Sequence, residues 1–135
     1  MRKELQAIIR DKIQCNEFTK DTFFVAKNVL LGSYLYTCFD GKLTGGIVTE
    51  VEVYIGGLDK ASHSYKGKRT KRTEVQFSPG GVAYVFLIYG MHAQFCVVTN
   101  EKDISDVVLI RSLQPTLGLD IMSERRKTSK KICSL

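Results

Sequence analysis

The sequence predicts an α+β domain in which a few helices flank a mostly antiparallel sheet. Apolar residues recur at helical spacing near the N-terminus, whereas residues 33–113 carry short β-branched and aromatic runs bounded by turn signals. The chain has 135 residues, of which 44% are hydrophobic and 25% charged, so it can form one core without disulfide staples. We therefore expect a single domain over residues 1–135.

Two helices are expected before the first strand. Residues 1–16 should form a short amphipathic helix, and a second helix should begin at a cap provided by Thr19 or Asp21 and end at Gly32. The apolar positions at helical spacing are Leu5, Ile8, Ile9 and Ile13 in the first helix, and Phe23, Ala26, Leu30 and Leu31 in the second.

Five later segments have strand character, and turn signals separate them. They are residues 33–39, 46–55, 82–89, 93–99 and 107–113. The segment 82–89 is nearly all apolar and should be a buried strand. Pro115 should end the last strand, and Thr116 should cap a closing helix that runs through Arg126.

The strand over residues 46–55 carries an acidic row. Alternation places Val48, Glu50, Glu52 and Tyr54 on one face. A carboxylate beside an aromatic ring can act as a general base next to a stacking surface. The alternative is a solvent-facing strand whose polar residues happen to alternate.

Two further residues stand out in apolar surroundings. Arg111 lies within an apolar strand, where a carboxylate or phosphate partner is needed; Glu52 is the candidate, and the alternative is an arginine that reaches water at the strand end. Tyr89 closes an aromatic run just before Gly90. It belongs either to the core or to a wedge of the kind that separates base steps in the minor groove.

Positive charge is concentrated in two places. The chain has 20 Lys and Arg against 14 Asp and Glu, a net charge of +6. The first cluster is Lys66, Lys68, Arg69, Lys71 and Arg72; the second is Arg125, Arg126, Lys127, Lys130 and Lys131. Such clusters suit nucleic-acid phosphates, although a solvated surface loop explains them equally well.

The cysteines indicate a reducing compartment and no metal site. Cys15, Cys38, Cys96 and Cys133 form no CxxC pair, and the two histidines add no ligand spacing. Cys38 and Cys96 have apolar neighbours and should be core residues. No apolar run reaches the ~20 residues that a membrane span requires, and no signal-peptide core is present.

Several motifs together resemble one protein family. The motifs are FFVAKNVLLG (23–32), GIVTEVEVYIG (46–56), DKASHS (59–64), GKRTKR (67–72), PGGVAYVFLIYGMH (79–92) and VLIRSLQP (108–115). In this order, over about residues 20–126, they resemble the alkyladenine or 3-methyladenine DNA glycosylases of the mammalian type, the methylpurine DNA glycosylases. The resemblance implies a barrel-like antiparallel core with flanking helices.

The resemblance also implies a reaction. Members of the family flip an alkylated or deaminated purine out of duplex DNA and hydrolyse its N-glycosidic bond. Glu52 would be the general base, acting on a water held between it and Arg111. No metal, cofactor or lysine nucleophile is implied, so the enzyme would be monofunctional and leave strand cleavage to others.

Binding roles follow from the same resemblance. Tyr54 and His63 would sandwich the flipped base, Phe86 would form a further wall, Cys96 would lie at the pocket floor, and Tyr89 would intercalate. The residues expected to contact the DNA backbone are Lys66, Lys68, Arg69, Thr70, Lys71 and Arg72.

The chain departs from the family pattern in four places. Phe86 replaces a tyrosine, and Thr73 and Cys96 stand where the family has asparagines, which affects the substrate range. Residues 129–135 stop near where the family continues into "LCxGPGKL" and further strands. We therefore expect a C-terminally truncated domain with reduced stability and impaired activity.

Two function classes remain open. One is a base-excision DNA glycosylase, and the other is a catalytically impaired or inactive remnant that binds duplex DNA without releasing a base. In both cases the expected partner is damaged double-stranded DNA, bound by a monomer away from membranes. The expected location is the cytoplasm and nucleoid of a bacterium or the nucleus of a eukaryote.

Overall fold

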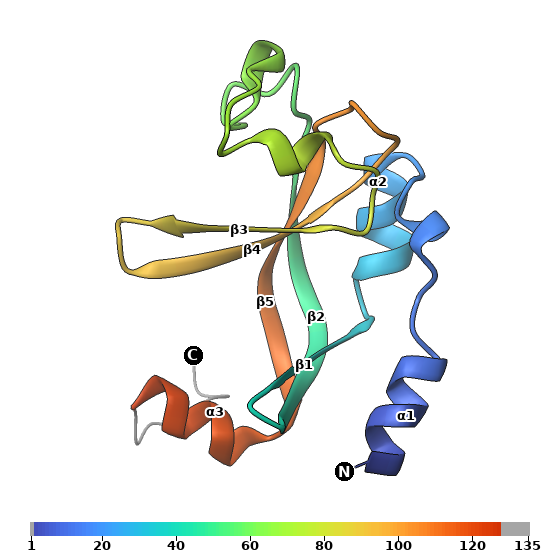
Figure 1. Ribbon diagram of the computed structural model, residues 1–135, viewed down its shortest axis with the longest axis vertical. Coiled ribbons are helices and arrows are strands. Elements are labelled where there is room, and N and C mark those ends of the chain that lie inside the picture. The colour runs from blue at the N-terminus through green and yellow to red at the C-terminus, as the bar shows by residue number, and fades with distance from the viewer. Residues whose placement is uncertain (1, 128–135) are drawn as a thin grey trace.

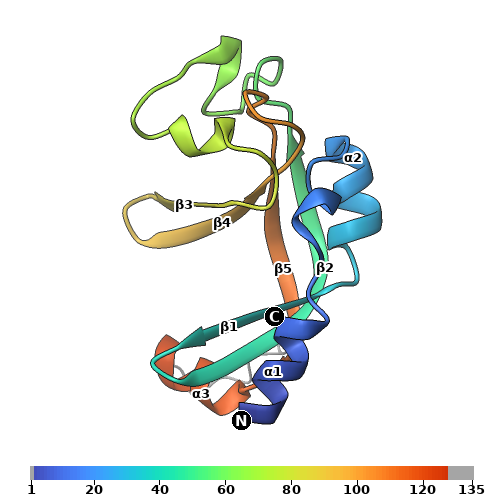
Figure 2. The same ribbon diagram turned by 45° about the vertical axis from the view of Figure 1, so that its right-hand side comes forward.

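The computed structural model describes residues 2–127 and contains a five-stranded antiparallel sheet. Its strands are β1 (Tyr34–Phe39), β2 (Lys42–Tyr54), β3 (Ala83–Ile88), β4 (His92–Val98) and β5 (Val107–Leu117), in the order β1-β2-β5-β4-β3. The sheet curls strongly into a half-barrel, and the β3–β4 hairpin crosses the long β2–β5 pair at a steep angle (Figure 1, Figure 2). The predicted α+β class with a mostly antiparallel sheet is confirmed.

The helices are short and lie at the ends of the described chain. They are α1 (Arg2–Arg10), α2 (Thr22–Phe24), which continues as a π-helix (Val25–Leu30), and α3 (Leu119–Arg126). Single 3-10 turns occur at Cys15–Glu17, Tyr65–Gly67 and Glu74–Phe77. No helix within residues 2–127 is long and apolar enough to cross a membrane.

The N-terminal helices follow the sequence only in part. The expectation of a helix over residues 1–16 is wrong beyond Arg10, where the chain turns away. The second helix begins as predicted, because the Asp21 side chain accepts a hydrogen bond from the Phe24 amide at 3.0 Å. Thr19 instead donates to the Asn16 carbonyl oxygen. Gly32 follows the helix with φ of +79°, the left-handed geometry expected of a helix terminator.

The two faces of the central strands have separate neighbours. On one face, Val108 of β5 packs with Val25 and Val29 of the α2 segment in a buried core. On the other face, Val107 and Leu109 pack with side chains of the β3–β4 hairpin. Successive residues of β5 therefore serve opposite faces, as strand geometry requires.

A bulge modifies the predicted alternation in β2. The pairing of β2 with β5 shifts register between Val48 and Glu50 and again between Glu50 and Val51. Val48 lines an apolar groove with Leu30 and Ile110, on the helix side of the sheet. The expectation that Val48 shares a face with Glu50 is therefore wrong.

Strand β5 runs further than predicted. Pro115 does not end it: Pro115 pairs opposite Gly46, beside a register shift, and the strand continues to Leu117. Proline is tolerated because β4 pairs with β5 only up to Leu109, which leaves the other side of Pro115 without a ladder partner. Thr116 lies in the strand, and α3 instead begins after Gly118 at a φ of +74°.

Two burial predictions need correction. Strand β3 is not buried throughout, because it is an edge strand: Tyr84 is 3% exposed whereas Val85 and Leu87 are more than half exposed. Cys38 lies in edge strand β1 and is exposed, while Cys96 is buried as predicted. The predictions for Lys130, Lys131 and Cys133, and for the side chain of Leu5, concern positions outside the described residues.

Candidate functional site

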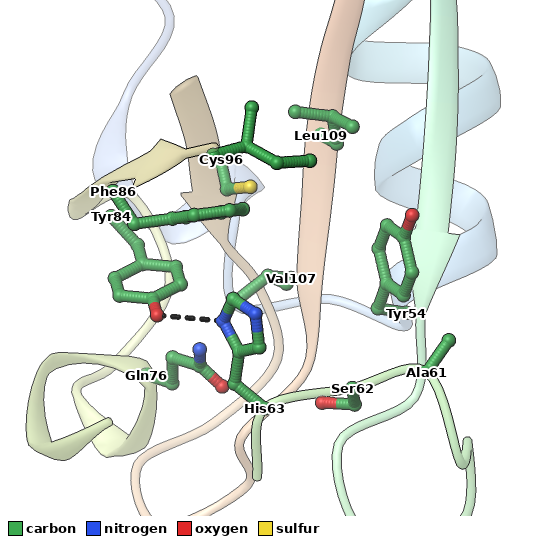
Figure 3. Close-up of a pocket in the computed structure, with 11 residues that line it drawn as sticks. Tyr54, Ala61, Ser62, His63, Gln76, Tyr84, Phe86, Cys96, Val107 and Leu109 are labelled. Carbon is green, nitrogen blue, oxygen red and sulfur yellow. Dashed lines mark hydrogen bonds between the residues drawn. The ribbon is translucent and has the colours of Figure 1, made fainter. Parts of the chain in front are cut away.

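A pocket of about 200 Å³ lies on the face of the sheet opposite the α2 segment (Figure 3). The four residues expected to bind a base all line it, namely Tyr54, His63, Phe86 and Cys96. For scale, a dry cavity of about 150 Å³ accommodates benzene. The pocket therefore has the size for a planar ring system somewhat larger than benzene.

Aromatic rings form two opposed sides of this pocket. Tyr54 stands on β2, across from His63 and the hairpin residues Tyr84 and Phe86 (Figure 3). The His63 ring lies edge-on to Phe86 with centroids 4.7 Å apart, and Phe86 is tilted against Tyr84 at 5.3 Å. A flat ligand between these sides can stack on either of them.

Tyr84 fixes the orientation of His63. The Tyr84 hydroxyl and His63 Nδ1 are hydrogen-bonded at 2.9 Å. The pKa of His63 is lowered below its ordinary 6.5. Desolvation is the larger cause and the positive charge of Arg72 the smaller one, although one side of the residue is exposed. The imidazole is therefore predominantly neutral at pH 7. The sequence had indicated Tyr84 only as part of an aromatic run, without a role.

Close backbone packing places the loop that carries His63. A Cβ on Gly56 would overlap the carbonyl oxygen and hydroxyl of Ser105, so only glycine fits there. The Gly56 amide donates to the Asp106 carboxylate at 2.9 Å. Further along, Asp59 accepts from the Ala61 amide at 2.8 Å, which closes the turn that leads to His63.

Asp106 is a buried structural carboxylate that sequence reasoning missed. It is 5% exposed and accepts hydrogen bonds from the Thr22 hydroxyl at 2.8 Å and the Asn100 amide at 3.3 Å, besides the Gly56 amide. It therefore ties α2 to the start of the site loop. Its sequence position in a polar turn gave no sign of these contacts.

The acidic row lies beside the pocket. Glu52 Oε1 contacts Arg111 at 2.8 Å, which confirms the predicted pairing, and Arg111 also reaches Glu50 at 3.5 Å. Glu52 Oε2 accepts a hydrogen bond from the Tyr54 hydroxyl at 2.7 Å. That bond, with burial, raises the pKa of Tyr54 to about 12, so the phenol remains protonated and keeps donating.

Solvent reaches the ion pair between Glu52 and Arg111. The Glu52 side chain is 37% exposed and that of Arg111 is 53% exposed. Arg111 thus has both features considered from the sequence, a carboxylate partner and access to water. An ion pair this exposed contributes little to stability.

The basic loop combines structural and unengaged charges. Arg69 pairs with Glu74 at 2.7 Å and Asp103 at 2.9 Å and covers the Phe77 ring. The hydroxyls of Thr70 and Thr73 are 3.1 Å apart within a turn. Arg69 and Thr70 therefore hold the loop together, whatever else they contact.

The other predicted backbone contacts point to solvent. Lys66, Lys68, Lys71 and Arg72 are exposed and form no ion pair with another described side chain. Arg72 lies 5.6 Å from the Phe86 ring centroid, which links the loop to the pocket wall. The buried Thr73 accepts from the Thr70 amide at 2.8 Å and donates to the Lys68 carbonyl oxygen, so it shapes the loop.

Tyr89 occupies the tip of the β3–β4 hairpin. Its side chain is 85% exposed, and its backbone is left-handed with φ of +53°. Gly90 and the exposed Met91 complete the tip. Tyr89 is therefore not a core residue. Its aromatic ring is exposed at the end of an extended hairpin.

Gln76 and Cys96 lie deeper in the pocket. Gln76, which the sequence did not single out, is 1% exposed and its Oε1 has no hydrogen-bond partner. Burial raises the pKa of the Cys96 thiol to about 12, so the sulfur carries its proton. Among the described residues, no three His, Cys, Asp or Glu side chains gather closely enough to hold a metal ion.

Comparison with known proteins places the chain in a family. Residues 16–135 match the family described as Methylpurine-DNA glycosylase (MPG). A Clostridium botulinum protein named "Putative 3-methyladenine DNA glycosylase" is 45% identical over 113 residues, which cover 84% of this chain and 55% of that protein. Proteins of the same name from Chlamydia felis and Alkaliphilus oremlandii are 45% and 40% identical, over 82% and 85% of this chain and 57% and 56% of theirs. The chain thus spans about half the length of the curated relatives it matches. This chain belongs to the methylpurine-DNA glycosylase family.

Proposed function

We propose that this chain is the catalytic part of a DNA glycosylase that removes alkylated purines of the 3-methyladenine type from duplex DNA. One observation carries the proposal: Tyr54 lines the aromatic pocket, and its hydroxyl donates a hydrogen bond to Glu52. The stacking surface and the carboxylate are therefore held as one unit. A base stacked on Tyr54 brings its glycosidic bond toward a fixed general base.

The chemistry is a hydrolysis. Glu52 accepts a proton from water, the water oxygen bonds to the anomeric carbon, and the electron pair of the carbon–nitrogen bond leaves with the base. An N3-alkylated purine carries positive charge and so leaves as a neutral base without prior protonation. Because Arg111 contacts Glu52 directly at 2.8 Å, the reacting water lies beside this ion pair and not in a gap between the two groups.

The pocket walls favour electron-poor bases. Tyr54, His63 and Phe86 offer aromatic faces and edges on both sides of the cavity. Stacking on an aromatic side chain is worth roughly 1–3 kcal/mol per base. A neutral His63, consistent with its lowered pKa, does not repel a cationic alkylated base.

The exposed elements suit duplex DNA. Lys66, Lys68, Lys71 and Arg72 supply phosphate contacts beside the pocket. Tyr89 at the hairpin tip enters the stack and replaces the flipped nucleotide. Base flipping is required because the bond to be cut is inaccessible inside the duplex.

The test is release of free 3-methyladenine from alkylated duplex DNA, measured by chromatography with undamaged duplex as control. We expect release from the alkylated duplex only, with strand breaks appearing after alkaline treatment and not before. A gel shift run in parallel separates the second candidate function, since binding without release identifies an inactive DNA-binding domain. If the chain neither binds the DNA nor releases a base, both candidate functions are wrong.

A further inference from the structure

The loop of residues 56–64 connects two opposed walls of the pocket. Tyr54 ends β2 two residues before the loop begins, and His63 lies near the end of the loop on the other side of the pocket (Figure 3). The loop contains no helix or strand, and its backbone-to-backbone hydrogen bonds stay within residues 55–68. Side-chain contacts and packing must therefore hold the loop against the rest of the molecule.

Three hydrogen bonds join this loop to other parts of the described chain. The Gly56 amide donates to the Asp106 carboxylate at 2.9 Å. The Ser64 hydroxyl donates to the Ser105 carbonyl oxygen at 3.3 Å. The third is the bond between His63 and the β3–β4 hairpin. Two of the three end on consecutive residues just before β5, and we call these two residues the 105–106 anchor.

The 105–106 anchor is buried and supported from the α2 side. Both of its residues are 5% exposed. The Thr22 hydroxyl donates to the Asp106 carboxylate at 2.8 Å, and the Thr99 hydroxyl donates to that of Thr22 at 3.0 Å. A buried polar network whose members are hydrogen-bonded specifies one arrangement. The loop is therefore attached to a rigid part of the molecule.

Each contact with the anchor lies beside a pocket wall. Gly56 follows Tyr54 by two residues, and Ser64 follows His63 directly. Val107, the residue after the anchor, lines the same pocket. Stacking depends on close contact, since a gap of about 0.5–1 Å forfeits roughly a quarter to a half of the dispersion energy. A small displacement of the loop is therefore enough to weaken a stacked ligand.

We infer that the 105–106 anchor is a positioning element that sets the separation between the Tyr54 and His63 walls and thereby the slot in which the base stacks. The inference rests on the proposed function, because it requires a planar base in this pocket. Ser64 and Asp106 do not line the pocket, so they act through the aromatic walls. The bond from His63 to the hairpin fixes one point of the loop, and the anchor fixes two more.

A matched pair of variants tests the contact at Ser64. Ser64→Ala removes the hydroxyl that reaches the anchor, whereas Ser105→Ala makes the same change but leaves the accepting carbonyl oxygen in place. Isothermal titration of the full chain with 3-methyladenine should show roughly three- to tenfold weaker binding in Ser64→Ala. Binding by Ser105→Ala should remain within about twofold of the wild type.

The contact at Asp106 is tested by a conservative rescue. Asp106→Ala removes the acceptor of the Gly56 amide and should weaken base binding, whereas Asp106→Asn keeps an oxygen for that amide and should restore it. Thr22→Val removes the support from the α2 side but leaves both loop contacts in place. It should lower the melting temperature while base affinity stays within about twofold of the wild type.

The outcomes separate a positioning role from a purely structural one. Base affinity that falls in step with melting temperature across all these variants would overturn the inference, and so would unchanged affinity in Ser64→Ala. A wild type that releases 3-methyladenine from DNA without binding the free base would also overturn it, while leaving the proposed function intact. If the wild type neither binds the base nor releases it from DNA, the proposed function is wrong as well.

Discussion

The two faces of strands β2 and β5 differ in what their side chains leave unsatisfied. Toward the α2 segment, Val25 and Val108 are fully buried in an apolar core. On the opposite face, Val107 forms part of a pocket that also contains an unpaired amide and adjoins a half-exposed carboxylate, Glu52. Both faces therefore contain a packed core, and under the proposed function only the pocket face also binds a ligand, so substitutions on the two faces should differ in their effect on binding.

The largest expected effect is at Glu52. Glu52→Gln keeps the hydrogen-bond acceptor toward Tyr54 but cannot take a proton from water, so base release should fall roughly 100- to 10,000-fold. Binding to alkylated duplex, measured by gel shift, should be retained. Glu50→Gln is the matched control, because Glu50 shares the face and contacts Arg111 at 3.5 Å without contacting Tyr54. Comparable losses in both variants would contradict the general-base role.

Adjacent valines in β5 offer a direct test of the division between faces. Val108→Ala should lower the free energy of unfolding by about 2 kcal/mol through a cavity beneath the α2 segment, with base binding unchanged at low temperature. Val107→Ala removes methyl groups from the pocket and should weaken base binding roughly fourfold. Denaturant unfolding measures the stability of both variants, and titration with the free base measures their base binding. Equal effects on binding would show that the faces are coupled.

Charged residues of the basic loop should also separate into two kinds. Lys71→Ala removes an exposed charge without a described partner, so DNA affinity should fall a few-fold and the slope of log affinity against log salt should decrease by about 0.9. Arg69→Met removes the contacts to Glu74 and Asp103 and should change the salt slope less than Lys71→Ala does, because the Arg69 charge is already compensated. Identical salt slopes for Lys71→Ala and the wild type would exclude a phosphate contact.

The sequence predicted the part of the site that depends on strand periodicity. Glu52 and Tyr54 were placed together because residues two apart share a face, and Arg111 needed a partner in its apolar strand. The family resemblance added His63, which no periodicity indicates. Gln76 and Asp106 could not be found in this way, because their burial depends on contacts between loops far apart in the chain.

The same distinction explains the errors in the fold. Cys38 and Val85 are apolar enough for a core, yet they lie on edge strands β1 and β3, and sheet order cannot be read from local composition. Pro115 is a strand terminator by local rules and is tolerated because the neighbouring strand stops short of it. Local signals predicted the elements, whereas their neighbours decided burial and length.

The smallest expected effect concerns pH and follows from the environment of His63. Burial and Arg72 lower the pKa of His63 below 6.5, so the unfolded chain takes up the proton more readily than the folded chain. The contribution of His63 to stability is therefore complete above about pH 6.5 and decreases as the pH falls through the lowered value. Thermal unfolding followed from about pH 7.5 to 5.5 should show this decrease in the wild type and less of it in His63→Gln. His92→Gln, at the other histidine of the chain, should keep the wild-type slope; if it flattens the slope instead, the titrating group is on the hairpin and not in the pocket.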